Sequence, residues 1–182
     1  MRKFLGLFLL LLIACEGEVV PKPKAYLDLS YPKAAYSNLT LERPYSFEVS
    51  KYSVIKDEPK KWLKIQYPRL KASVDITYRP VKNNISELIQ EAEKLVLKHT
   101  VKADKISNQN FVNPEKRVFG TLNEITGNAA SQIQFHLTDS THHFIKGALY
   151  FKTRPNYDSV LPAIEYIRKD VLQLIETLVW KD

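Results

Sequence analysis

The sequence has little cysteine, little glycine and few of the motifs that mark common active sites. One cysteine, at position 15, stands among 182 residues, so no intramolecular disulfide can stabilise the fold. Five glycines and ten prolines exclude collagen-like and Gly/Pro-rich low-complexity chains. The sequence contains no G-x-S-x-G, no H-E-x-x-H, no Walker loop and no dinucleotide-binding glycine pattern. These absences argue against the familiar hydrolases, zinc proteases and nucleotide-binding proteins.

The single long apolar run lies at the N-terminus. Arg2 and Lys3 precede eleven uncharged, leucine-rich residues that end at Ala14. A helix that crosses a bilayer needs about 20 residues, so this run is too short to span one. Its length and cationic start are typical of a secretion signal, and we predict a signal peptide over residues 1–14.

The cysteine follows this run directly. Residues 12–15 read Leu-Ile-Ala-Cys, which resembles the lipobox of bacterial lipoproteins, where a small residue precedes the lipidated cysteine. We expect Cys15 to become the first mature residue and to carry a diacylglycerol on its sulfur. Two or more acyl chains anchor a protein stably to a membrane. A buried strand with a free thiol is the alternative, but the charged residues of Glu16-Gly17-Glu18 follow at once.

The remaining chain is long enough for one domain. Pro21-Lys22-Pro23 favours an extended spacer, so residues 15–24 are assigned to a lipidated tether. Residues 25–182 are then expected to form a single globular domain with a sizeable core.

The charge balance of the mature chain is only mildly basic. Loss of Arg2 and Lys3 with the signal leaves 25 basic and 20 acidic residues. The lysines are scattered, and their densest group, between Lys56 and Lys64, is interrupted by Asp57 and Glu58. This pattern is typical of a solvated face, and we expect no nucleic acid among the partners.

Alternation of apolar and polar residues predicts the strands. The clearest pair is a hairpin formed by residues 63–67 and 70–79, with Pro68-Arg69 at the turn. The stretches 32–44 and 101–116 show no such alternation and are interpreted as turns and a connector. The other predicted strands are residues 25–31, 45–50, 117–125, 130–138 and 143–152.

Two segments have helical spacing. The first begins after Asn84, with Glu87 at the capping-box position, and its apolar stripe ends at His99, which we interpret as a boundary side chain. The second is capped by Asp158 or Ser159 and carries Pro162 in its first turn. The order strands, helix, strands, helix predicts an α+β fold, an antiparallel sheet of about six strands with two main helices.

His136, His142 and His143 flank Asp139-Ser140. A tight turn at that dipeptide would place His136 opposite His143, with Cβ atoms about 5 Å apart. A zinc site takes roughly three or four ligands, and the nearest carboxylate, Asp139, lies in the turn itself. His136 and His143 are therefore weak metal candidates, better explained as polar residues on an exposed sheet face, and we expect no metal and no cofactor.

Two short segments resemble the O-glycosylation motif of exported proteins in the Bacteroidetes. They are Asp139-Ser140-Thr141 and Asp158-Ser159-Val160. Asp-Ser is also ordinary turn and cap chemistry, so the motif is not specific. Ser140, at a hairpin tip, is the better candidate acceptor.

Five longer blocks of the sequence are distinctive: PKPKAYLDLSYP (21–32), NPEKRVFG (113–120), GNAASQIQF (127–135), TDSTHHFIKGALYF (138–151) and PNYDSVLPAIEYI (155–167). Together they resemble the gliding-motility lipoprotein GldD family of the Bacteroidetes. The resemblance implies an envelope lipoprotein that is required for gliding and is linked with type IX secretion of adhesins. It carries over no catalytic residue, and Cys15 is the one site residue that it transfers. The element order is also similar to the PsbP/Mog1-like α/β/α sandwich, whose members mostly serve as binding or assembly modules.

The expected function is therefore that of a non-enzymatic lipoprotein, held on a membrane of the cell envelope and facing the periplasm. Its expected partners are the membrane and the envelope proteins of the gliding and secretion machinery. Two alternatives stay open. One is an envelope enzyme acting on peptidoglycan or glycan, and the other is a lipid- or small-ligand-binding module that uses some of the ten tyrosines and eight phenylalanines as a pocket.

Overall fold

The computed structural model describes residues 30–153 and 156–181. The predicted signal peptide, Cys15, the tether and all but the end of the predicted strand 25–31 lie outside this range. In the described part, residues 30–35 belong to no strand or helix.

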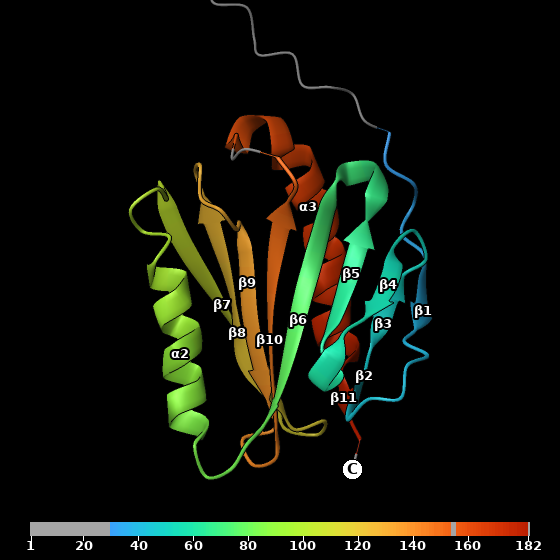
Figure 1. Ribbon diagram of the computed structural model, residues 1–182, viewed down its shortest axis with the longest axis vertical. Coiled ribbons are helices and arrows are strands. Elements are labelled where there is room, and N and C mark those ends of the chain that lie inside the picture. Colours follow the sequence, from blue (N-terminus) through green and yellow to red (C-terminus); the bar gives the residue numbers. More distant parts are fainter. Residues whose placement is uncertain (1–29, 154–155, 182) are drawn as a thin grey trace, which may run out of the picture.

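Seven strands form one antiparallel sheet in the order β4-β5-β6-β10-β9-β8-β7 (Figure 1). Their bounds are β4 Val54–Asp57, β5 Leu63–Tyr67, β6 Ala72–Pro80, β7 Lys105–Asn113, β8 Val118–Thr126, β9 Ile133–Thr138 and β10 His143–Phe151. Two small sheets flank it. They pair β1 Tyr36–Asn38 with β3 Glu48–Ser50, and β2 Tyr45–Ser46 with β11 Val179–Trp180. The predicted α+β class is confirmed.

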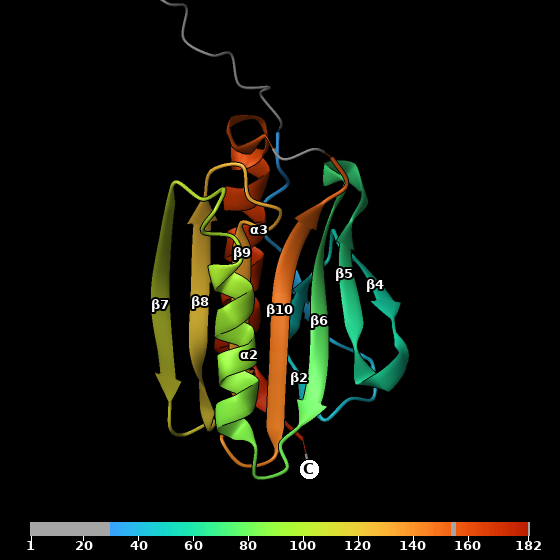
Figure 2. The ribbon, with the colours of Figure 1, turned by 60° about the vertical axis from the view of Figure 1, so that its left-hand side comes forward.

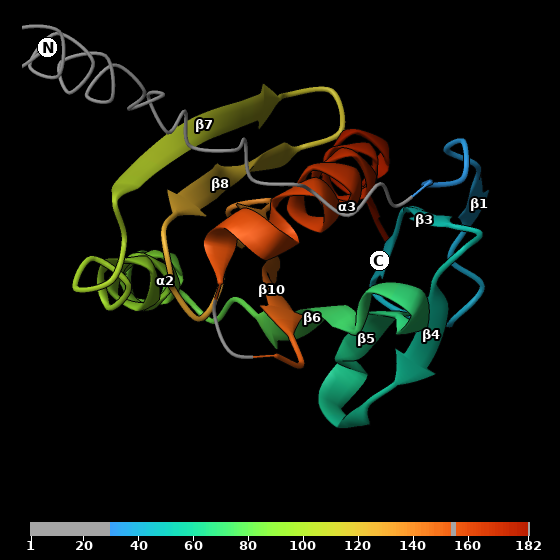
Figure 3. The same ribbon diagram turned by 90° about the horizontal axis from the view of Figure 1, so that it is seen from above.

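The two helices lie on opposite faces of the sheet. Helix α2 spans Ile85–Leu97 and packs on β9 and β10, whereas α3 spans Tyr157–Thr177 and packs on β3 and on the other face of β9. Seen from above, the sheet runs between them as the middle of three layers (Figure 3). After β6 the chain crosses as α2 to the far edge at β7, and hairpins return it to β10, which pairs with β6 from Ala72 to Pro80.

The main core lies on the α3 face. Apolar side chains of α3 pack there against the inward residues of β5, β6, β9 and β10. Fully buried members include Leu63, Ile76, Phe135, Leu137, Ile145, Leu149 and Ile167. The α2 face holds two smaller clusters, around Leu88 and Phe144 and around Val96 and Ile125. The predicted hairpin is confirmed, because Ile65 pairs with Val74 and Leu63 with Ile76.

Four strands of the described residues were not predicted from the sequence. β1 falls in the stretch interpreted as turns, β7 in the stretch interpreted as a connector, β4 between two predicted strands, and β11 after the last predicted helix. β4 and β7 are the edges of the main sheet, where polar side chains face solvent on both sides. Backbone hydrogen bonds to one neighbouring strand hold β4 and β7 in the sheet. Because these bonds do not depend on the side chains, the sequences of the two strands show no regular alternation of apolar and polar residues.

The helix caps also differ from the prediction. Asn156, rather than Asp158 or Ser159, caps α3, because its side chain accepts a hydrogen bond from the Ser159 amide at 3.4 Å. Pro162 consequently lies in the second turn of α3 rather than the first. Asn84 precedes α2, but its side chain accepts from the Lys82 amide at 2.9 Å and makes no bond to the helix.

Candidate functional site

The predicted pairing of His136 with His143 is wrong. His136 pairs with Lys146, and Thr138 pairs with Phe144, so residues 139–142 form a longer turn than Asp139-Ser140 alone. His136 lies on the α2 face, stacked on Phe144 with ring centroids 5.8 Å apart, and burial lowers its pKa. His143 lies on the other face, stacked on Trp180 at 5.3 Å. A shared metal site would need both side chains on one face.

Asp139 explains the longer turn. Its buried carboxylate accepts hydrogen bonds from the backbone amides of Thr141, His142 and His143, at 3.0, 2.8 and 2.8 Å. The Thr141 hydroxyl bonds its second oxygen at 3.0 Å. These donors hold the pKa of Asp139 far below its usual range, against the opposing effect of burial. Three amides that converge on one carboxylate require four residues in the turn.

Ser140 occupies the tip of this turn. It is exposed, and its backbone is in the left-handed region with φ 70°. Its amide donates to the Thr138 hydroxyl at 2.9 Å. The tip is open to a modifying enzyme, but O-glycosylation of Ser140 stays a prediction. Among residues 30–153 and 156–181, no three His, Cys, Asp or Glu side chains gather closely enough to hold a metal ion.

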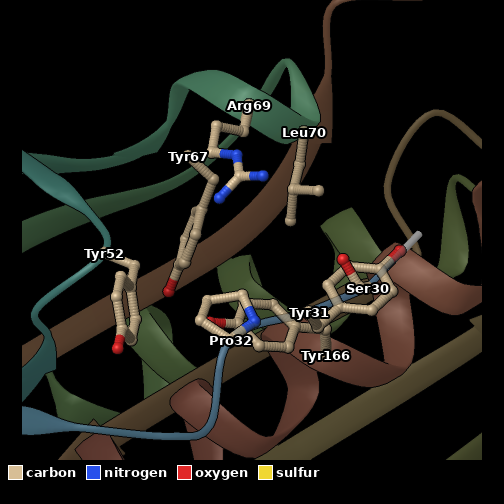
Figure 4. Close-up of a pocket in the computed structure, with 8 residues that line it drawn as sticks. All are labelled: Ser30, Tyr31, Pro32, Tyr52, Tyr67, Arg69, Leu70 and Tyr166. Atoms are coloured by element: carbon tan, nitrogen blue, oxygen red, sulfur yellow. The ribbon is translucent and has the colours of Figure 1, made fainter.

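A different set of side chains lines a cavity of about 150 Å³. We call it the tyrosine pocket. It is lined by Ser30, Tyr31, Pro32, Tyr52, Tyr67, Arg69, Leu70 and Tyr166. Figure 4 shows that Tyr67, Arg69 and Leu70 approach it from one side, with Tyr31, Pro32 and Tyr166 opposite and Tyr52 beside Tyr67. The pocket therefore depends on the tertiary fold and not on any local motif.

The elements around the pocket position these side chains. Tyr67 ends β5, and the turn that follows, the 3₁₀ segment Pro68–Leu70, carries Arg69 and Leu70. Tyr166 projects from α3 and stacks on Tyr31, with ring centroids 4.8 Å apart. Tyr67 is 4% exposed and Tyr52 is 48% exposed. The aromatic wall thus runs from the protein interior to solvent.

Asp170 lies one helical turn after Tyr166, which lines the tyrosine pocket. It is 6% exposed, and the Tyr36 hydroxyl donates to its Oδ1 at 3.0 Å. Its Oδ2 has no hydrogen-bond partner of ordinary geometry among the described residues. Burial raises the pKa of Asp170, and the neighbouring hydroxyls of Tyr36, Tyr67 and Ser50 offset only part of the rise. We call these four residues, together with Tyr166, the Asp170 cluster.

The pKa values of Tyr36 and Tyr67 are also raised in this environment. Desolvation, together with the nearby Asp170 carboxylate, raises the pKa of Tyr36 to about 12 and that of Tyr67 further still. All of them stay protonated near neutral pH, so each hydroxyl can donate. The pocket and the cluster together offer aromatic faces, hydroxyl groups, one carboxylate and one guanidinium.

Sequence reasoning missed this site, although one signal was present. Ile167, Val171 and Leu174 mark the buried face of α3, and Asp170 falls on it at helical spacing. A carboxylate on an apolar stripe needs an explanation, and Tyr166 four residues earlier shares its face. The other contributors come from separate segments, and no sequence spacing links them.

The comparisons with known proteins address the whole chain. A family model described as gliding motility lipoprotein GldD matches residues 16–180. No curated protein matches the chain by sequence. Within the described ranges, neither helix is long and apolar enough to cross a membrane.

Proposed function

The chain belongs to the family of the gliding motility lipoprotein GldD, and on this premise we propose that it is an accessory or assembly factor that acts by binding envelope proteins. Family membership implies a gliding-motility lipoprotein with a lipid anchor in an envelope membrane. The proposal adds that the domain faces the periplasm, serves the type IX secretion pathway and performs no catalysis of its own.

The family match is the observation that carries this proposal. It begins at residue 16, directly after the cysteine predicted to carry lipid. An anchored domain is confined near the membrane, and its effective concentration for an envelope partner is therefore high enough for weak contacts to suffice.

The open edge of the sheet offers a surface for such a partner. β7 pairs with β8 on one side only, and Figure 2 shows it at the outer edge of the sheet. Its Val112 is 71% exposed. Between β7, β8 and α2 lies a hollow of about 340 Å³, lined by Leu97, Ile106, Asn108, Asn110 and other residues. An extended segment of a partner can pair with β7 through backbone hydrogen bonds and place side chains in this hollow.

The edge is tested by Val112→Lys, which places a charge on β7 where a partner would dock. We expect loss of colony spreading and of surface adhesins, with normal protein abundance, and loss of a partner that is otherwise crosslinked to the wild type. Val54→Lys is the matched control, because Val54 is 52% exposed on β4, the opposite edge of the sheet. Equal effects of the two variants would contradict docking at β7.

The anchor is tested by Cys15→Ala. We expect a protein that incorporates no labelled fatty acid and is released from the membrane fraction. A variant that reaches the periplasm should lose most of its activity at normal expression and recover part of it when overproduced, as the loss of tethering predicts. Full activity at normal expression would show that the anchor does not act by concentrating the domain.

A further inference from the structure

The Asp170 cluster contains more poorly paired polar atoms than an ordinary protein core. Six buried side-chain polar atoms of the described residues lack a hydrogen-bond partner of ordinary geometry, and four of them belong to the Asp170 cluster or to the adjoining tyrosine pocket. They are Tyr31 Oη, Tyr166 Oη, Ser50 Oγ and Asp170 Oδ2. Ser50 lies near both Asp170 and Tyr166, so some of these atoms face one another without a hydrogen bond of ordinary geometry. Buried polar atoms in native proteins are nearly always well paired, and a group of imperfectly paired ones beside one cavity favours a bound group.

The lining favours an organic cation in the interior of the pocket. The faces of tyrosine rings carry partial negative charge and attract ammonium groups. Tyr31, Tyr52, Tyr67 and Tyr166 line the cavity. The carboxylate of Asp170 does not line it, but lies near enough to the hydroxyls of Tyr67 and Tyr166 to raise their pKa. A cation placed there would also favour the ionised form of Asp170, which burial alone disfavours.

The mouth of the pocket favours an anion. Arg69 is exposed and lines the same cavity. Its positive charge lies near enough to the Tyr166 hydroxyl to oppose the rise in the pKa of that group. No carboxylate among the described residues forms an ion pair with it, whereas Arg43, Arg79 and Arg168 are all paired. A free guanidinium binds phosphate or carboxylate well. Arg69 would repel a ligand that carries only a positive charge, and the Asp170 carboxylate would repel one that carries only a negative charge. The two residues together therefore favour a zwitterion.

We propose that the tyrosine pocket binds the head group of a zwitterionic phospholipid, with its ammonium among the tyrosines and its phosphate on Arg69. A cavity of about 150 Å³ has room for a head-group ammonium and is too small to hold a whole acyl chain. Ser30 lines the pocket and lies 15 residues after Cys15, so the predicted anchor keeps the pocket within reach of a membrane surface. This inference is independent of partner binding at β7.

The test uses the mature chain with Cys15→Ala, which has no lipid of its own. Soluble phosphoethanolamine and phosphocholine are titrated by calorimetry, and vesicles of phosphatidylethanolamine and phosphatidylcholine are tested by flotation against vesicles of phosphatidylglycerol. We expect binding to the zwitterionic probes and co-flotation with the zwitterionic vesicles only. Binding of the soluble zwitterions without flotation would overturn the lipid source and leave a free zwitterion as ligand.

Variants separate the two charges. Arg69→Gln and Asp170→Asn should each weaken binding about tenfold, and Tyr52→Ala about fivefold. Lys71→Gln is the matched control, because Lys71 is an exposed cation two residues from Arg69 that does not line the pocket. Thermal melting confirms that each variant is folded. Absence of binding by the wild type, or unchanged binding in both Arg69→Gln and Asp170→Asn, would overturn the proposal.

Discussion

Asp139 and Asp170 are equally buried but behave in opposite ways. They are 5% and 6% exposed, yet the pKa of Asp139 is lowered and that of Asp170 is raised. The difference is the number of donors. Asp139 accepts three amide hydrogen bonds and one from a hydroxyl. Asp170 has only hydroxyl neighbours, and of these Tyr36 alone donates with ordinary geometry. Burial alone thus does not decide the state of a carboxylate, because hydrogen bonds can more than compensate for lost water.

The comparison separates a structural role from a functional one. The Asp139 carboxylate satisfies the turn between β9 and β10 and has little capacity left for a ligand. One oxygen of Asp170 lacks a hydrogen bond of ordinary geometry, and a poorly satisfied buried carboxylate costs stability. Groups with perturbed pKa values often lie at functional sites.

A carboxylate with no donors at all would extend the comparison, and Val74→Asp creates one. Val74 is 1% exposed on the α3 face of β6, between Ile65 and Leu149. We expect a loss of about 4 kcal/mol or more in the free energy of unfolding, measured by urea denaturation. Asp75→Asn is the control on the opposite face, where it removes only the partly exposed pair with Lys64 and should change stability by less than about 1 kcal/mol. Equal losses would mean that the two faces of β6 are misassigned.

Removal of the Asp139 carboxylate should cause the next largest loss in the free energy of unfolding. Asp139→Ala leaves three amides without their acceptor, and we expect a loss of about 2–4 kcal/mol. Asp139→Asn keeps one acceptor oxygen and should lose less. Because the folded-state pKa is lowered, this stabilisation is complete above the unfolded-state pKa, near 4, and disappears as the pH falls below it. A difference between wild type and Asp139→Ala that persists undiminished at pH 2 would contradict this assignment.

How well the sequence predicts each region follows from the range of its interactions. The hairpin of β5 and β6 was predictable because alternation reports directly on a buried and a solvated face. The turn between β9 and β10 was predicted too short. The alternation of apolar and polar residues does not reveal that the Asp139 carboxylate accepts hydrogen bonds from three backbone amides. The Asp170 cluster was missed because Tyr36, Ser50 and Tyr67 reach it from other strands. Local periodicity carries no information on such convergence.

The contribution of Asp170 to stability should depend on pH in the opposite direction to that of Asp139. The raised pKa of Asp170 means that the folded state holds this proton more tightly than the unfolded state. Its contribution to stability is therefore most favourable at low pH and declines as the pH rises from about 4 through the folded-state pKa. Asp170→Asn cannot ionise and should lack this decline, with a stability within about 1 kcal/mol of wild type at low pH. Urea melts of both proteins from pH 3 to pH 8 measure it. Parallel curves would show that Asp170 is not strained by burial.

The smallest expected effect is at Ser140, which adjoins Asp139 without contributing to its hydrogen bonds. Asp139 accepts hydrogen bonds from the amides of residues 141–143, and Ser140 is exposed and donates none of them. Ser140→Ala should thus change stability by less than about 0.5 kcal/mol. If Ser140 carries an O-glycan, intact mass measurement of protein from its native envelope should show an added mass that this variant lacks. Ser159→Ala is the matched control at the second motif, where the serine hydroxyl donates to the Asn156 carbonyl at the start of α3 and is less available. A glycan mass that survives Ser140→Ala and disappears in Ser159→Ala would move the modification from the turn to the helix cap.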